Sequence, residues 1–422
     1  MKRSMMYLLL CIMVISAISV QAAATNGTAQ REPVKLVLAN HWTGARIPLM
    51  DEQLREFERL YPWVTVENQV GSPGQTADQK YTVAIISGAG PDVWMVQRNR
   101  VPEFVEKGLL QPLDAFMEQE GFSMSIFYPS EQASCQYKNN TYVLPMPAAS
   151  LSLLYYNRTL LAEGGYSPDK PPATWDEILA MALRLQRISP DGRVEISGGD
   201  IKYLPTFRLA QFAYANGAQI FNGPFDINYL TDEVRQTVNW GMEWVQRVPA
   251  GGAMALGTLV FEPYGEWYYF DLQNRAPDLD VGIALLPHGP SGELQNIVGG
   301  GWSYGIPADA KHPYESWLLV KFLTASEAAR NFAFSQARPS PVIKYTQDRR
   351  YFDQNPYWHI IGETLNRSVV VSPTPVMQQI LNADIRAWQA VMKGQESPEA
   401  ILTKLQNDVD VIIADYLRTA NQ

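Results

Sequence analysis

The hydrophobic positions of the first hundred residues alternate between two periods. Residues 34–42 form a nearly continuous apolar run, which is typical of a buried strand, whereas residues 48–62 repeat their apolar side chains every three or four positions and predict a helix. Residues 64–70 and 92–96 indicate two further strands, and residues 80–86 a helix between them. Such alternation with short connections predicts βαβ units on a mostly parallel sheet, and therefore an α/β fold.

The loops that follow the strands of such a sheet are candidate binding loops. Ligands of open α/β sheets gather at the carboxyl ends of the strands. The first of these loops holds Trp42, and the loop after the third strand holds Arg98 and Asn99. A solvent-exposed loop would be polar as well, so the pattern alone leaves both interpretations open.

The second half of the chain is more helical. A stretch of small residues at 148–150 separates two extended runs, and we interpret it as a crossing between two lobes. Beyond it, Thr174 and Glu177 form the capping-box pattern that starts a helix with one apolar face. Trp240 and Trp244 lie four positions apart on another amphipathic pattern, which predicts that both are buried in a core.

Residues 1–24 have the pattern of a cleaved secretory signal peptide. Lys2 and Arg3 precede an apolar run from residue 7 to residue 20, and small residues follow at positions 22–24. Cys11 comes directly after Leu10, where a lipid anchor would need a small residue, so we interpret it as part of the leader. We therefore expect a mature protein that is soluble in the periplasm or outside the cell.

The composition argues against several classes of function. The net charge at pH 7 is −9, and it becomes −11 without the leader, which carries Lys2 and Arg3. An acidic surface disfavours nucleic acid and anionic membranes as partners. The four histidines show no metal-ligand spacing and the chain has no phosphate-binding glycine motif, so we expect neither a metal nor another cofactor. Cleavage leaves Cys135 alone, which rules out an intramolecular disulfide, and we expect a monomer.

Several segments in a fixed order carry a resemblance to a known family. They include VLANHW at 37–42, SGAGPDVWMV at 87–96, YVLPMPAASLSLLYYN at 142–157, PYGEWYYF at 263–270 and GGGWSYG at 299–305. With them the chain resembles the extracellular solute-binding proteins of ABC importers, and specifically the carbohydrate-binding branch that includes maltose-binding protein. The resemblance implies a two-lobed periplasmic-binding-protein fold of the α/β class, with a hinge and a ligand cleft between the lobes.

The resemblance also implies how the chain divides and what it does. Residues 31–148 and 303–345 would form the first lobe, and residues 149–302 and 346–422 the second. The lobes would close over a mono- or oligosaccharide, which the protein would deliver to the membrane permease of an ABC importer. Such a protein is a carrier and not an enzyme.

Aromatic side chains are expected in a sugar-binding cleft, because a pyranose has an apolar face of C–H groups inside a rim of hydroxyls. Trp302 follows three glycines that would let the backbone approach a ligand, although these glycines could also serve only a tight strand entry. Trp267 occupies the Gly-x-Trp position whose indole stacks on the sugar in the family. Tyr264 and Trp42 complete the aromatic set.

Polar contacts complete the site that the resemblance implies. Family members use the loop that matches Arg98 and Asn99 to hydrogen-bond sugar hydroxyls, and Glu266 is a candidate acceptor for such hydroxyls. Arg338 would reach in from the returning segment, and Ser150 stands where family members often carry an acidic or polar contact. The full predicted site comprises Trp42, Arg98, Asn99, Ser150, Tyr264, Glu266, Trp267, Trp302 and Arg338.

Two other interpretations remain open at this point. Residues 301–305 match the Gly-x-Ser-x-Gly nucleophile elbow, which would make Ser303 the nucleophile of a secreted carbohydrate-active hydrolase. Pro307 keeps the residue before it extended, however, so the helix that such an elbow requires is not expected there. A glycosidase would instead need two carboxylates, for which Glu266 and Asp271 are candidates. The same fold could also bind a polar solute that is not a sugar, such as a polyamine or a phosphate ester.

Overall fold

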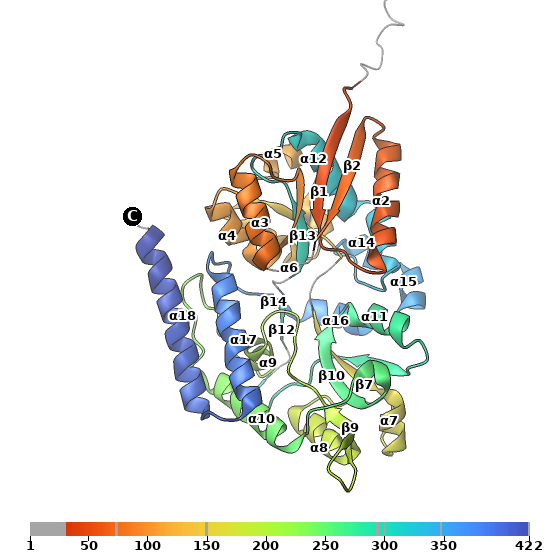
Figure 1. Ribbon diagram of the computed structural model, residues 1–422, viewed down its shortest axis with the longest axis vertical. Coiled ribbons are helices and arrows are strands. Elements are labelled where there is room, and N and C mark those ends of the chain that lie inside the picture. Colours follow the sequence, from red (N-terminus) through yellow and green to blue (C-terminus); the bar gives the residue numbers. More distant parts are fainter. Residues whose placement is uncertain are drawn as a thin grey trace, which may run out of the picture.

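The chain folds into two lobes, each built on one β-sheet with helices packed around it. The computed structural model describes residues 31–71, 75–147, 151–292, 295–298, 301–346 and 348–420. Figure 1 shows one lobe above the other, with the amino-terminal strands in the upper lobe and the two carboxy-terminal helices in the lower. The predicted signal peptide and Ser150 lie outside the described residues. Among those that are described, no helix is long and apolar enough to cross a membrane.

The sheet of the first lobe confirms the alternation of strands and helices that the hydrophobic pattern predicts. Its strand order is β2-β1-β3-β13-β6. The first three strands are parallel neighbours, and β13 runs antiparallel to both β3 and β6. The strands are β1 (Val34–Asn40), β2 (Val64–Val70), β3 (Val93–Gln97), β6 (Val143–Pro145) and β13 (Trp302–Gly305). The late strand β13 therefore completes a sheet that the beginning of the chain starts.

Helices and short elements cover this first sheet. The helix α2 contributes Met50, Leu54 and Phe57 to the core, which matches the spacing of its apolar residues. The elements are α2 (Arg46–Leu60), α3 (Gln75–Ile86), η1 (Arg98–Arg100), α4 (Val101–Glu106), α5 (Asp114–Gln119), η2 (Met124–Ile126), α6 (Pro129–Ser134), β4 (Gln136–Tyr137), β5 (Asn140–Thr141), α12 (Pro313–Ala325), α13 (Glu327–Phe334) and α14 (Ile343–Thr346).

The sheet of the second lobe has the strand order β11-β7-β10-β9-β8. It is mixed, because β10 runs antiparallel to β7 and parallel to β9. The strands are β7 (Ser152–Asn157), β8 (Arg187–Ile188), β9 (Val194–Gly199), β10 (Leu259–Gly265) and β11 (Val281–Ala284). The helices are α7 (Arg158–Glu163), α8 (Trp175–Leu185), α9 (Leu209–Tyr214), α10 (Asp232–Arg247), η3 (Met254–Leu256), α11 (Tyr268–Arg275), α15 (Arg349–Gln354), α16 (Trp358–Asn366), α17 (Met377–Lys393) and α18 (Pro398–Ala420). The capping box predicted at Thr174 is present at the start of α8.

Both faces of the second sheet carry a hydrophobic core. Successive residues of a strand point to opposite faces, and along β7 Leu153 and Tyr155 enter one core whereas Leu154 and Tyr156 enter the other. The larger core also holds Trp240 and Trp244, which are 7% and 3% exposed. The prediction that these two indoles are core residues is confirmed.

A buried carboxylate ties the carboxy-terminal helices to the second lobe. Asp384 of α17 is fully buried and accepts hydrogen bonds from the backbone N–H groups of Arg208 (2.7 Å), Leu209 (3.2 Å) and Ala210 (2.8 Å) at the start of α9. The hydroxyl of Tyr229 donates to the same side chain at 3.2 Å. Asp384 thus caps a helix that lies far from it in the sequence.

The two lobes meet at a joint built from segments that cross between them. The strand β12 (Asn296–Val298) pairs in parallel with β14 (Ser368–Val370), which follows α16. The helix α13 contributes Phe332 to the core of the first lobe, and its next two residues, Ala333 and Phe334, to a core of the second. The end of α13 is therefore in contact with both lobes.

A candidate ligand site between the lobes

The first-lobe side of the candidate site is the edge of the sheet where β1 and β3 end and β13 begins. Trp302 is the register partner of Gln97, and the backbone N–H of Arg98 donates to the carbonyl of Gly301 at 2.9 Å. The backbone N–H of His41 lies 3.3 Å from the sulfur of Met95, which holds the first loop beside the second. Three loops that are distant in the sequence therefore meet at one edge, as the parallel pairing requires.

Trp302 is partly exposed at this edge and leans on a histidine. Its ring centroid lies 5.1 Å from that of His41, with the planes tilted by 57°. The Nδ1 of His41 is 3.1 Å from the carbonyl oxygen of Gly71, and burial lowers the pKa of the imidazole, which favours the neutral ring. The Nε2 of His41 is buried and has no hydrogen-bond partner among the described residues. The contact with His41 helps to fix the Trp302 indole, which can then present a flat apolar surface.

Ser303 does not have the geometry of a nucleophile elbow. Its side chain is fully buried within β13, and its hydroxyl donates to the carbonyl oxygen of Val96 at 3.0 Å. The next helix, α12, begins only at Pro313. A nucleophile elbow needs an exposed hydroxyl at a tight turn from strand to helix, so the Gly-x-Ser-x-Gly match is explained by sheet structure.

Trp42 is more deeply buried than an aromatic residue that stacks on a ligand would be. It is 5% exposed, its indole N–H donates to the hydroxyl of Tyr304 at 3.2 Å, and its ring meets the edge of Phe332 at 5.2 Å. Its polar group is therefore already used within the first lobe. Trp42 supports the floor of the site and offers a ligand little surface.

Arg98 and Asn99 are adjacent but have different surroundings. The Arg98 guanidinium is buried and pairs with the carboxylate of Glu131, which is also buried. Asn99 is partly exposed, but its Oδ1 is buried and has no hydrogen-bond partner among the described residues. The Arg98 pair braces the loop, and Asn99 stays a predicted ligand contact.

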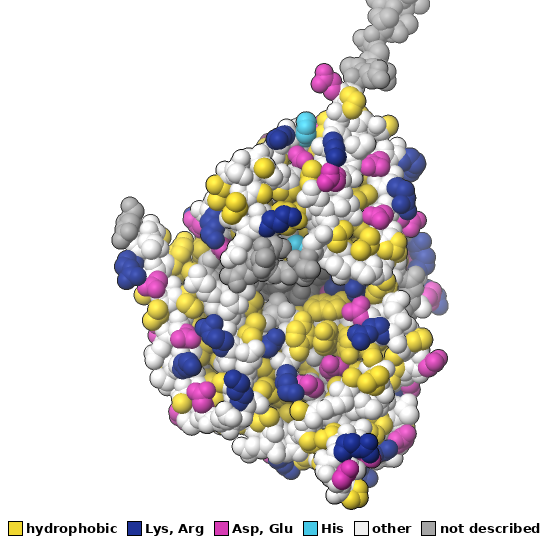
Figure 2. Space-filling model, in the orientation of Figure 1, with side chains coloured by type: hydrophobic (Ala, Val, Ile, Leu, Met, Phe, Trp, Pro, Cys, Tyr) yellow, Lys and Arg dark blue, Asp and Glu magenta, His cyan; other side chains and the backbone are white. Residues whose placement is uncertain are grey.

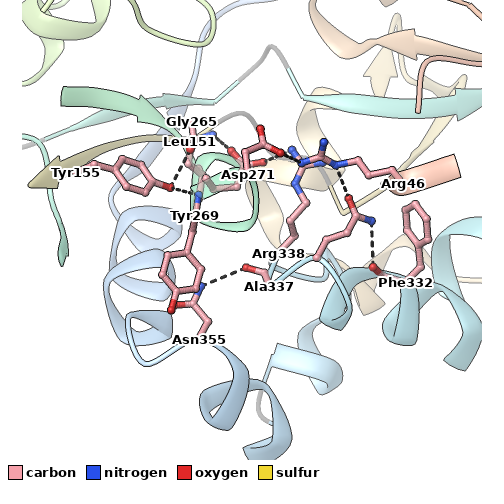
Figure 3. A network of polar contacts seen from close by, with 12 residues as sticks. Arg46, Leu151, Tyr155, Gly265, Tyr269, Asp271, Phe332, Ala337, Arg338 and Asn355 are labelled. Atoms are coloured by element: carbon pink, nitrogen blue, oxygen red, sulfur yellow. Dashed lines mark hydrogen bonds and ion pairs between the residues drawn. The ribbon is translucent and has the colours of Figure 1, made fainter. Parts of the chain in front are cut away.

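The second-lobe side is the edge where β10 ends beside the start of β7. Gly265 is the register partner of Ser152. The hydroxyl of Tyr155 donates to the carbonyl of Gly265 at 2.9 Å and accepts from the backbone N–H of Tyr269 at 3.2 Å, which fixes the turn that carries Trp267 (Figure 3). A Cβ at position 265 would lie 2.3 Å from the Trp267 ring. Glycine is needed there because the indole folds back over its backbone.

An aromatic cluster lies around this turn. The ring centroid of Tyr264 lies 4.2 Å from that of Tyr268, 4.6 Å from that of Tyr203 and 6.0 Å from that of Trp267. All four side chains are partly exposed. Figure 2 shows hydrophobic side chains of the lower lobe gathered beside the hollow that separates the two lobes. The cluster gives the second lobe an apolar surface with hydroxyl groups at its edge.

Sequence reasoning missed two rings of this cluster, Tyr268 and Tyr203. Tyr268 donates to Glu262 at 2.8 Å, and burial raises the pKa of that carboxyl to about 7. Tyr264 and Tyr268 are four residues apart, a spacing that could have drawn attention to Tyr268. Tyr203 comes from a distant segment, and nothing in its local sequence marks it.

Glu266 and Arg338 form a buried ion pair. The Glu266 carboxylate accepts from Arg338 Nη2 at 3.0 Å through one oxygen and from the backbone N–H of Leu151 at 2.9 Å through the other. The Arg338 guanidinium lies 5.4 Å from the ring centroid of Trp42 and 5.6 Å from that of Trp267. Both oxygens of Glu266 are thus engaged by the protein, and Arg338 connects the indoles of the two lobes.

No cluster of metal-binding side chains occurs within the described ranges.

Comparison with known proteins decides the family of this two-lobed chain. Residues 43–330 match the sequence model of the bacterial extracellular solute-binding proteins. The chain belongs to this family. As a solute-binding protein it is also 31% identical, over 361 residues, to the maltotriose-binding protein of Pyrococcus abyssi, with 78% of this chain and 72% of that relative aligned. The resemblance identified from the sequence motifs is confirmed.

Solved structures confirm the two-lobed α/β fold of this solute-binding protein. One of them is the maltose/maltodextrin-binding domain MalE of Bdellovibrio bacteriovorus, bound to maltotriose. It superposes with a TM-score of 0.76 at 18% identity, and the alignment covers 91% of this chain and 100% of that domain. Another is an ABC transporter solute-binding protein of Thermotoga lettingae, bound to α-D-tagatose. Its TM-score is 0.75 at 22% identity, and the alignment covers 91% of this chain and 100% of that protein. At these identities the likeness concerns the fold alone.

Proposed function

We propose that this solute-binding protein captures a mono- or oligosaccharide between its lobes and delivers it to the membrane permease of an ABC importer. The observation that carries the proposal is the presence of partly exposed aromatic rings at the end of each sheet, Trp302 on the first lobe and Tyr264 with Trp267 on the second. Indole and phenol rings cover the C–H face of a pyranose, while amide and hydroxyl groups pair with its hydroxyls. A phosphate ester would instead call for exposed cations, and the two cations of the predicted site, Arg98 and Arg338, are both buried in ion pairs.

The other predicted residues support this surface from behind. Trp42, Arg98, Glu266 and Arg338 hold the loops and the Trp267 turn in place, and Ser150 remains a predicted contact. The relative from Pyrococcus abyssi, a maltotriose-binding protein, supports the substrate class. We further propose that the protein acts as a secreted monomer after loss of its signal peptide, and that it releases its sugar chemically unchanged.

A thermal-shift screen tests the proposed function. The purified protein is heated with a panel of mono- and oligosaccharides and, separately, with polyamines and sugar phosphates. A saccharide present at about 100 times its dissociation constant should add roughly 2.7 kcal/mol to the free energy of unfolding. The saccharide that gives the largest shift should be recovered intact after prolonged incubation. Stabilisation by a polyamine alone would replace the proposed substrate class, and cleavage of the saccharide would restore the hydrolase interpretation.

Replacing Trp267 or Trp302 by alanine should weaken binding of that saccharide at least about fivefold each, because an aromatic contact contributes roughly 1 kcal/mol beyond its buried area. Both rings are partly exposed, so the unfolding midpoint should change little. Isothermal titration calorimetry measures the affinity. Trp63→Ala is the matched control, since Trp63 is also partly exposed but precedes β2, at the other end of the first sheet.

Gly265→Ala should also weaken binding of the saccharide, although it removes no aromatic ring. The added methyl group would meet the Trp267 indole and displace it. Gly362→Ala is the control, because a Cβ at that helical glycine meets no atom within 4 Å. Unchanged affinity in Trp267→Ala, Trp302→Ala and Gly265→Ala would remove the proposed site.

A further inference from the structure

A charged contact joins the two lobes directly at the edge of the site. Arg46 begins α2, which packs on the first-lobe core, and Asp271 lies on α11, which packs on a core of the second lobe. Their side chains meet at 2.9 Å between Nη2 and Oδ1 (Figure 3). The Arg46 guanidinium also lies 4.9 Å from the ring centroid of Phe270, the residue before Asp271. One arginine of the first lobe thus makes two contacts with the second.

A buried glutamine holds the Arg46 side chain in place. The Nε of Arg46 donates to Oε1 of Gln336 at 2.9 Å, and Gln336 Nε2 donates to the carbonyl of Phe332 at 3.0 Å. Gln336 is fully buried, so its amide has a fixed orientation. A guanidinium that is oriented before it meets its partner loses less side-chain entropy on pairing than a free surface arginine does.

Gln336 belongs to a turn at the joint that is itself fixed. Ala337 has a left-handed backbone with φ of 50°, and its carbonyl accepts from Asn355 Nδ2 at 3.2 Å. The next residue, Arg338, makes the buried pair with Glu266. Figure 3 shows these contacts as one continuous network that runs from the joint to Arg46 and Asp271. The buried pair lies at the joint, whereas the Arg46–Asp271 pair joins elements of opposite lobes.

We propose that the Arg46–Asp271 pair is a latch that favours the arrangement in which α2 and α11 are in contact, which we define as the closed one, and thereby sets the affinity of the site without touching the ligand. The contact joins protein atoms only, so it stabilises the closed arrangement with or without a ligand. The side chains of Arg46 and Asp271 are 15% and 31% exposed, so water can reach the pair and the latch can open reversibly. An ion pair of this exposure with a cation–π contact should shift the ratio of closed to open protein about three- to tenfold.

The latch goes beyond the proposed function, and its distance measurement needs no ligand. Spin labels introduced at Arg55→Cys on α2 and Gln273→Cys on α11, both exposed positions, report the distance between the lobes by electron–electron double resonance. Cys135 is buried and will not compete for the label. Asp271→Asn, Arg46→Gln and the double variant are compared with the labelled parent. Asp408→Asn is the control, because it removes an ion pair with Arg386 that lies within the second lobe.

Each single variant should shift the distance distribution towards longer values, and the double variant should shift it no further than either single one, since both remove the same contact. For the compound that gives the largest shift in the thermal-shift screen, the dissociation constant should rise by the factor by which the closed fraction falls. Distributions that coincide in the parent and both single variants would overturn the latch, as would a full additive shift in the double variant. None of these outcomes depends on the substrate class, so failure of the latch leaves the proposed function standing.

Discussion

Replacing Trp244 by alanine is expected to lower the free energy of unfolding by about 3–5 kcal/mol, the usual cost of truncating a buried aromatic side chain. Trp244 lies on α10, is 3% exposed and packs 5.8 Å from Trp240 in the larger core of the second lobe. Its ring also lies against Gly199 of β9, where a Cβ would come within 2.9 Å of it. The cavity left by the indole would be lined by a helix and a strand that cannot both move inwards.

Equilibrium unfolding in urea measures this loss. Trp302→Ala is the opposite case, since it removes an indole of equal size from a partly exposed position and should affect binding far more than stability. A loss below about 1 kcal/mol in Trp244→Ala would contradict the assignment of this residue to the core.

Asp384→Asn should cost about 2–3 kcal/mol at pH 7, the second largest effect that we expect on stability. The carboxylate accepts from three backbone N–H groups at the start of α9. An amide has one acceptor oxygen and would direct its NH₂ group at a backbone donor. A buried donor would then lose its partner, and the contact between α17 and α9 would loosen. Chemical denaturation of both proteins at pH 7 gives the difference, and equal stabilities would refute the capping role.

The pH dependence of this difference has a definite sign. Burial raises the pKa of Asp384 to about 6 from an ordinary value near 3.8. A raised pKa means that the folded state holds the proton more tightly than the unfolded state, so the group stabilises most below pH 4 and progressively less as the pH rises to about 6. The asparagine variant lacks this titration. The stability gap between the two proteins should therefore be widest near pH 4 and narrow towards pH 7.

Elements with a strong periodic pattern could be predicted from the sequence. The strand runs, the capping box at Thr174 and the burial of Trp240 and Trp244 all follow from local spacing. The rule that ligands gather at the carboxyl ends of parallel strands also pointed to the loops of Trp42 and Asn99, which do meet at one sheet edge beside Trp302.

The roles of individual site residues depended on contacts over long sequence distances. Trp42 is withdrawn into the core because its N–H meets Tyr304, 262 residues later. Glu266 is engaged because Arg338, 72 residues away, returns to it through the joint. No local pattern encodes either pairing, so a loop position alone could not separate a platform residue from a supporting one.

The central claim, that a saccharide binds between the lobes and draws them together, is tested most directly by titrating the doubly spin-labelled protein with the saccharide selected in the thermal-shift screen. The account predicts that the short inter-lobe distance gains population along the same isotherm as the heat measured by calorimetry. The reason is that a ligand shifts the equilibrium only through contacts that the closed arrangement provides. Heat that saturates while the distance distribution stays unchanged would contradict it.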